Sequence, residues 1–104
     1  ELNKCGVPTK ELRNGLVLKP ATCFKKAVIQ TYNDHRMAMC FAVLGTMDAM
    51  SNGKPWITIK NPVCVNKTFP NFFETLEDAA RQSYAAARKP FSSLVLTSGG
   101  KPVF

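Results

Sequence analysis

A histidine and an arginine stand side by side where an apolar stretch of this 104-residue chain begins. Asn33 or Asp34 can cap a helix there, because a short polar side chain accepts hydrogen bonds from the first free backbone N–H groups. His35 and Arg36 would then lie in the first helical turn, where the partial positive charge of the helix disfavours a cation. An external anion removes this conflict, since it would receive the N–H groups, the guanidinium and the imidazole together. The segment therefore predicts an anion-binding site.

A lysine occupies a similar place later in the chain. Lys67 precedes a second predicted helix start, with Thr68 as a candidate cap and Pro70 suited to the first helical turn. Two helix N-termini that each carry a cation predict one shared anion site. Chance juxtaposition is the alternative. In that case Arg36 is a surface arginine paired with a nearby acid, and Lys67 is a solvated loop residue.

The net charge of +7 suits an anionic partner. Nucleic acid is disfavoured as that partner, because the Lys and Arg residues are scattered rather than gathered into a stripe or a tail. Phe69, Phe72 and Phe73 fall at helical spacing with Leu76, which predicts a packed helix face rather than a base-stacking surface. Small phosphorylated or carboxylated metabolites fit the charge equally well.

The four cysteines and the single histidine do not form a metal-binding pattern, because no two cysteines are spaced as a CxxC pair. We expect no metal site, and reduced thiols in an intracellular setting. Cys40 falls within an apolar helical segment and is expected to be buried. No apolar run approaches the length that spans a membrane, and no signal or transit peptide is visible. The first residue is Glu rather than Met, which favours a piece of a longer chain or a processed product.

Turn signals and hydrophobic periodicity predict helices and strands in alternation. In the first third we expect a helix end at 1–5 closed by Gly6, strands at 7–12 and 16–18 around Arg13-Asn14-Gly15, a loop at 21–26 and a strand at 27–30. Later we expect a buried helix at 37–50, a strand at 56–60, a loop at 63–67, a helix at 70–88, and a short strand at 94–96 before a turn at 98–100. The pattern is α+β (α/β) with mixed strands, so we expect a mixed sheet covered by helices.

Two motifs carry a resemblance to a known family. The run TYNDHRMAM at 31–39, followed after a short strand by NPVCVNKTFPNFFETL at 61–76, closely resembles the C-terminal part of the 3-phosphoshikimate 1-carboxyvinyltransferase (EPSP synthase) family. Residues 1–20 are also similar to that family's helix-end, strand, strand passage. The resemblance covers roughly residues 1–80, with a weak patch at 21–26, and residues 83–104 have no match that we can place.

The resemblance implies an architecture and a reaction. Each of the family's two domains is built from βαβαββ repeats, and this chain resembles the last repeat of an inside-out barrel domain, in residues 1–82, with a helix end and an unmatched tail in 83–104. The family transfers the carboxyvinyl group of phosphoenolpyruvate to the 5-hydroxyl of shikimate 3-phosphate, releases phosphate and needs no cofactor. The implied partners are these two substrates and the rest of the enzyme chain, without nucleic acid or membrane. The family occurs in the cytoplasm and in plastids.

The resemblance also assigns catalytic and substrate-binding roles. Arg36 matches the family arginine that grips phosphoenolpyruvate, which suits the two-point contact of a guanidinium with a carboxylate or phosphate. His35 matches the adjacent histidine, which would hydrogen-bond the phosphate or help to move a proton. Lys67 matches a lysine that reaches the same site and would follow the leaving phosphate.

Neighbouring residues are expected to support these three. Asp34 would cap the helix or fix Arg36 rather than act as a base, and Thr68 would cap the second helix. Tyr32 is expected to be a packing residue.

Other readings stay open at this point. The family's acid/base groups lie upstream of Glu1, so the 104 residues alone are expected to be inactive. A stand-alone basic module that binds an anion without catalysis is one alternative. A piece of a UDP-N-acetylglucosamine enolpyruvyl transferase, which shares the fold and the phosphoenolpyruvate donor, is another, although its corresponding stretch lacks the His-Arg-Met-Ala-Met pattern.

Overall fold

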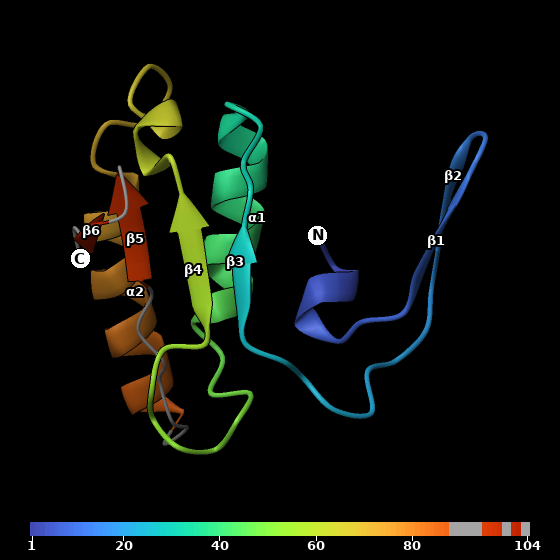
Figure 1. Cartoon of the computed structure of the whole chain (residues 1–104). Helices are drawn as coiled ribbons and strands as arrows, with labels where there is room; N and C mark the ends of the chain where they lie inside the picture. The colour runs from blue at the N-terminus through green and yellow to red at the C-terminus, as the bar shows by residue number, and fades with distance from the viewer. Residues whose placement is uncertain (88–94, 99–100, 103–104) are drawn as a thin grey trace.

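A computed structural model describes residues 1–87, 95–98 and 101–102 of the chain. These residues form a mixed α/β structure, as the sequence pattern predicts (Figure 1). The α-helices are α1 (His35–Gly45) and α2 (Phe72–Ala86), and the short 3₁₀-helices are η1 (Asn3–Cys5) and η2 (Pro62–Val65). The strands are β1 (Thr9–Leu12), β2 (Gly15–Leu18), β3 (Ala27–Ile29), β4 (Ile57–Lys60), β5 (Val95–Ser98) and β6 (Lys101–Pro102).

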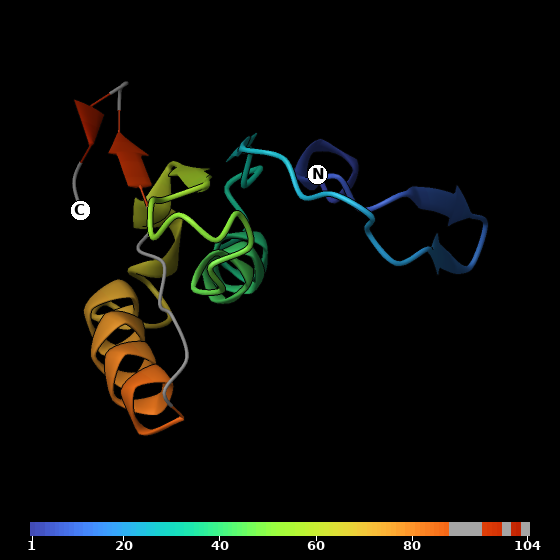
Figure 2. The same cartoon turned by 90° about the horizontal axis from the view of Figure 1, so that it is seen from below.

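The larger sheet is mixed, with the strand order β3-β4-β5-β6. The first three of these strands are parallel to one another, and β6 runs antiparallel to β5. Both α-helices lie on one face of this sheet, as successive crossovers of the same hand require (Figures 1 and 2). The expected strand at 94–96 is thus present as β5, while Leu94 and the two glycines of the predicted turn lie outside the described residues.

The core forms between that sheet face and α1. In β3, Ala27 and Ile29 are buried while Val28, between them, is 47% exposed on the other face. In β4, Ile57 and Ile59 are buried in the same alternation. This period of two is the strand pattern that the sequence predicts. The facing residues of α1 recur at helical spacing and are Ala38, Phe41, Ala42 and Gly45.

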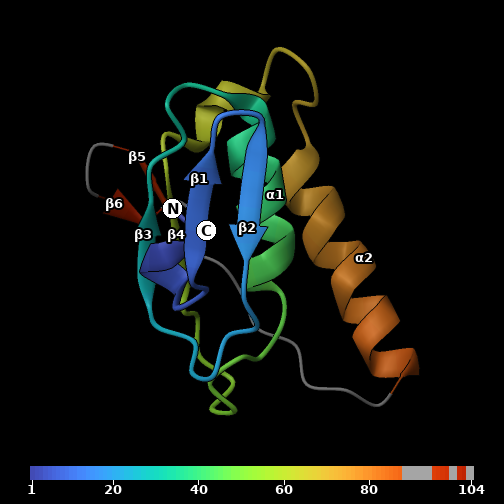
Figure 3. The same ribbon diagram turned by 90° about the vertical axis from the view of Figure 1, so that its right-hand side faces the viewer.

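The hairpin β1–β2 stands apart from the larger sheet and the helices (Figures 1 and 2), and Figure 3 shows its two strands side by side. Its register pairs Leu12 with Gly15, so Arg13 and Asn14 form the turn where the sequence predicts it. The preceding η1 ends at Gly6, whose φ of 90° is left-handed. A Cβ atom at Gly6 would lie 2.3 Å from the backbone oxygen of Cys23, so glycine is required there on two grounds.

The expected helix at 37–50 is wrong at its C-terminal end, because α1 ends at Gly45. Thr46 follows it, and its hydroxyl donates to the carbonyl oxygen of Val43 at 2.8 Å. The expectation that Cys40 is buried is also wrong, since Cys40 is exposed. Cys40 is exposed because the buried residues of α1 form one stripe, Ala38, Phe41, Ala42 and Gly45, so the apolar composition of the helix overstates its burial.

The second helix begins later than its sequence predicts. Asn71 is the N-cap of α2, and the backbone N–H of Thr68 instead donates to the carbonyl oxygen of Val65 at 3.0 Å. Thr68 is therefore not the cap, and Pro70 lies in the turn before the helix. The expected loop at 63–67 is in part the 3₁₀-helix η2. Arg88, the predicted helix end, lies outside the described residues.

Candidate functional site

Two loops and a helix start meet at the edge where β3 and β4 have their carboxyl ends. The two strands are parallel, so the loop after β3 and the segment after β4 leave the sheet side by side. The N-terminus of α1 lies at this same edge (Figure 1), and α1 also contacts η2. Crevices at the carboxyl ends of parallel strands are where open α/β sheets bind their ligands.

The loop after β3 is a tight turn with unusual backbone angles. Tyr32 and Asn33 have φ values of 54° and 55°, and the N–H of Asp34 closes the turn by donating to the carbonyl oxygen of Thr31 at 2.8 Å. Positive φ at both central residues is typical of a type I′ turn, which glycine and asparagine favour and which strains a residue as large as tyrosine. Tyr32 is 71% exposed, so the expectation that it is a packing residue is wrong.

This turn is tied to the segment that follows β4. The hydroxyl of Thr31, a buried residue, donates to the carbonyl oxygen of Lys60 at 2.9 Å. Farther along the same two loops, Nδ2 of Asn61 donates to Oδ1 of Asn33 at 3.2 Å. The two loops of the carboxyl edge are therefore held together by side-chain hydrogen bonds.

Asp34 caps α1, as predicted, and binds Arg36 at the same time. Its Oδ1 accepts from the backbone N–H of Arg36 at 2.9 Å and from Nε of the same residue at 3.1 Å, and its Oδ2 accepts from Nη2 at 3.0 Å. These bonds to the guanidinium, and then the one to the backbone, hold the pKa of the Asp34 carboxyl below its usual value. The same contact raises the pKa of Arg36.

The pair with Asp34 leaves part of the Arg36 guanidinium available. Asp34 engages it side-on, through Nε and Nη2, so the donors on Nη1 and the second donor on Nη2 still point away from the carboxylate. The Arg36 side chain is 78% exposed. The arrangement can therefore accept a second, external carboxylate or phosphate without breaking the internal pair, although an acid-paired surface arginine has the same geometry.

His35 and Lys67 lie on the two sides of this edge. His35 is the first residue of α1 and is half-buried. Lys67 is exposed in the turn that follows η2, five residues before α2 begins rather than at its N-terminus. That turn is fixed by Val65, a fully buried residue whose carbonyl oxygen accepts from the N–H groups of Thr68 and Phe69. The topology thus places the segments that carry His35, Arg36 and Lys67 at one edge of the sheet.

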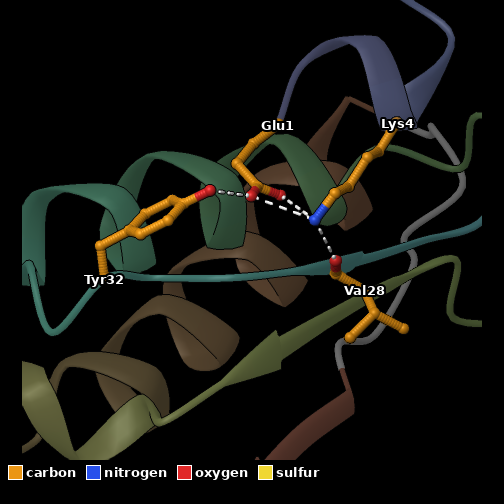
Figure 4. Close-up of polar contacts among 4 residues, drawn as sticks. All are labelled: Glu1, Lys4, Val28 and Tyr32. Atoms are coloured by element: carbon orange, nitrogen blue, oxygen red, sulfur yellow. Dashed lines mark hydrogen bonds and ion pairs between the residues drawn. The ribbon is translucent and has the colours of Figure 1, made fainter.

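A second polar cluster reaches this edge from the N-terminal segment (Figure 4). The Tyr32 hydroxyl donates to Oε1 of Glu1 at 2.7 Å, and Nζ of Lys4 lies 3.1 Å from the same oxygen and 2.8 Å from Oε2. Burial opposes ionisation of Glu1, but the hydrogen bonds from Lys4 and Tyr32 outweigh it and lower the pKa of its carboxyl. Glu1 and Tyr32 are 31 residues apart, so no local sequence signal indicates their contact.

The described residues contain no group of three His, Cys, Asp or Glu side chains that could hold a metal ion. The cysteines among them are free thiols. Within the same part of the chain, no helix is both long enough and apolar enough to cross a membrane.

Comparison with known proteins gives one consistent result. The family model described as EPSP synthase (3-phosphoshikimate 1-carboxyvinyltransferase) matches residues 1–76. A 3-phosphoshikimate 1-carboxyvinyltransferase of Opitutus terrae is 44% identical over 85 residues, 82% of this chain and 20% of the relative. Proteins of the same name are 49% identical over 77 residues in Baumannia cicadellinicola, covering 74% of this chain and 17% of the relative, and 44% identical over 81 residues in Buchnera aphidicola, covering 78% and 18%. The chain spans about a fifth of the length of these curated relatives.

Proposed function

The chain belongs to the EPSP synthase family, and on this premise we propose that it supplies part of the phosphoenolpyruvate site of a 3-phosphoshikimate 1-carboxyvinyltransferase. The reaction would move the carboxyvinyl group of phosphoenolpyruvate to the 5-hydroxyl of shikimate 3-phosphate and release phosphate. The observation that carries the proposal is the geometry of Arg36, which Asp34 holds at a helix N-terminus with donors still directed to solvent.

The proposed roles divide the charge of the substrate among three side chains. Arg36 binds a carboxylate or phosphate oxygen pair through its free N–H donors. Lys67, a point charge on a flexible stem, neutralises the phosphate as it leaves. His35 hydrogen-bonds the phosphate beside the free backbone N–H groups of α1, where the helix dipole also favours an anion. Asp34 orients Arg36, and Thr68 belongs to the turn that holds Lys67.

We further propose that residues 1–82 correspond to the last βαβαββ-type repeat of an inside-out barrel domain, and that residues 83–104 form a helix end and a tail. Helices on a single sheet face support this assignment, since an inside-out barrel keeps its helices within and its strands outside. The remaining contacts to shikimate 3-phosphate, and the acid/base groups, would come from the rest of a longer chain. The 104 residues alone would bind without turnover, because electrostatic contacts by themselves do not move the required protons.

The site is tested by titrating the chain with phosphoenolpyruvate and monitoring the binding through NMR line shifts. We expect shifts at the amides of residues 34–37 and 66–68. Arg36→Ala and Lys67→Ala should each weaken binding about tenfold, which corresponds to loss of one charge-assisted contact. Arg13→Ala and Lys10→Ala are the matched controls, because they remove the same charges from the exposed hairpin.

The controls also separate this proposal from its alternatives. A basic module that binds anions non-specifically would lose affinity equally in all four variants, and would bind sulfate as well as it binds phosphoenolpyruvate. No shift at the carboxyl edge of a folded chain would contradict the proposed half-site. A uridine-linked acceptor used in place of shikimate 3-phosphate by a longer protein would favour the other enolpyruvyl transferase.

A further inference from the structure

We propose that Glu1 is a positioning residue for the anion site, because its carboxylate holds the strained turn before α1 through the hydroxyl of Tyr32. The expected effect on phosphoenolpyruvate binding rests on the proposed function, whereas the expected effect on the turn rests on its geometry. It gives a role to Glu1 and Tyr32, which have none among the proposed roles of the substrate-binding residues.

The Glu1 carboxylate is built into the fold rather than solvated. Its side chain is 5% exposed, although it lies in a stretch whose neighbours are largely open to solvent. Lys4, which binds it, also donates from Nζ to the carbonyl oxygen of Val28 in β3 at 3.4 Å (Figure 4). The carboxylate is thereby held at a defined place beside the strand that leads into the turn, so it can act as a fixed anchor.

Tyr32 needs such an anchor. Its φ of 54° is a conformation that a bulky side chain rarely adopts, and such strain persists only where surrounding contacts determine it. With 71% of the residue exposed, packing does not supply those contacts. Its side chain makes a charge-assisted hydrogen bond of 2.7 Å to Glu1, which supplies such a contact.

Each residue of the turn makes its own hydrogen bond to another part of the chain. Thr31 is bonded to the end of β4, Asn33 to Asn61, and Asp34 to Arg36, as described above. Tyr32 supplies the tie to the N-terminal segment. If that tie is lost, the turn can relax toward unstrained angles, and relaxation moves Asp34, which sets both the first N–H groups of α1 and the orientation of the Arg36 guanidinium.

The experiment uses the 104-residue chain with Tyr32→Phe, Glu1→Ala and their combination. Two quantities are measured: hydrogen exchange of the Asp34 amide, which closes the turn, and the dissociation constant of phosphoenolpyruvate. We expect Tyr32→Phe and Glu1→Ala each to speed Asp34 exchange and to weaken binding about five- to tenfold. The double variant should weaken binding no more than Glu1→Ala alone, because the Tyr32 hydroxyl has already lost its acceptor in that variant. Glu1→Gln keeps an acceptor oxygen and should recover most of the loss.

Tyr84→Phe is the matched control. It removes a tyrosine hydroxyl that lies 3.3 Å from the Thr46 hydroxyl at the opposite end of α1, and it should change neither quantity. The proposal is overturned if Tyr32→Phe leaves Asp34 exchange within twofold of the parent, if the two single changes add, or if Tyr84→Phe has the same effect. Absence of phosphoenolpyruvate binding by the unmodified chain would instead contradict the proposed function, while Asp34 exchange would still decide whether Glu1 holds the turn.

Discussion

At the scale of single residues, the candidate site depends on one carboxylate with two tasks. Asp34 both caps α1 and orients Arg36. The first task requires only an acceptor oxygen, which Asn also provides. The second depends on two oxygens and a negative charge. Substitutions at this one position can therefore separate the stability of the helix from the positioning of the guanidinium.

Asp34→Ala should lower Tm by about 4 °C, because the helix loses its cap. Asp34→Asn should leave Tm nearly unchanged, yet Arg36 should become more mobile, which NMR relaxation of its Nε–H would report. The pKa of Asp34 is lowered, so its ionised contribution to stability is complete above the ordinary pKa of about 4 and is lost as the pH falls through the lowered value. Equal Tm losses in both variants, or an Asn variant with Arg36 as rigid as in the parent, would contradict this division.

How much of the site could be predicted from sequence depends on the separation of the residues involved. The Asp34 cap and the place of Arg36 in the first turn are local, and the sequence predicts both. The contacts of Tyr32 with Glu1 and of Asn33 with Asn61 join residues 31 and 28 positions apart, and no periodicity indicates them. The sequence predicts a packing role for Tyr32, whereas the residue is 71% exposed. Its positive φ is not visible in the sequence.

At the scale of elements, the sequence predicts best the strands that turn residues or a regular alternation mark clearly. The hairpin follows from Arg13-Asn14-Gly15, and β4 follows from the alternation of residues 57–60. The two helix ends for which the prediction is wrong lack such a signal. Apolar residues continue after the end of α1. Before α2, Thr68 and Asn71 are both residue types that cap helices, so the sequence does not show which of them is the cap.

Gly6 allows a sharp test at this scale, because it ends η1 and thereby places Glu1 and Lys4. Gly6→Ala should destabilise the chain by about 1–3 kcal/mol, since the residue has positive φ and the new Cβ would contact the backbone of Cys23. Gly15→Ala is the control, because its Cβ would meet nothing within 4 Å. Chemical denaturation measures both. A Gly6 variant as stable as the Gly15 variant would contradict the described close approach.

At the scale of the whole molecule, the chain has one helix-covered sheet and a projecting hairpin. The hairpin exposes Leu12, Leu16 and Leu18, each more than half open to solvent. The net charge of +7 attracts small anions from a distance. The chain spans about a fifth of the length of the curated relatives that it matches.

The measurement that tests this account most directly is the activity of a chimera. The 85 aligned residues of the Opitutus terrae relative are replaced by the matching residues of this chain, and carboxyvinyl transfer is assayed with phosphoenolpyruvate and shikimate 3-phosphate. The account predicts an active chimera whose activity falls at least about a hundredfold with Arg36→Ala and not with Arg13→Ala. A folded chimera without activity, or one that is indifferent to Arg36→Ala, would contradict the claim that this chain supplies part of the phosphoenolpyruvate site.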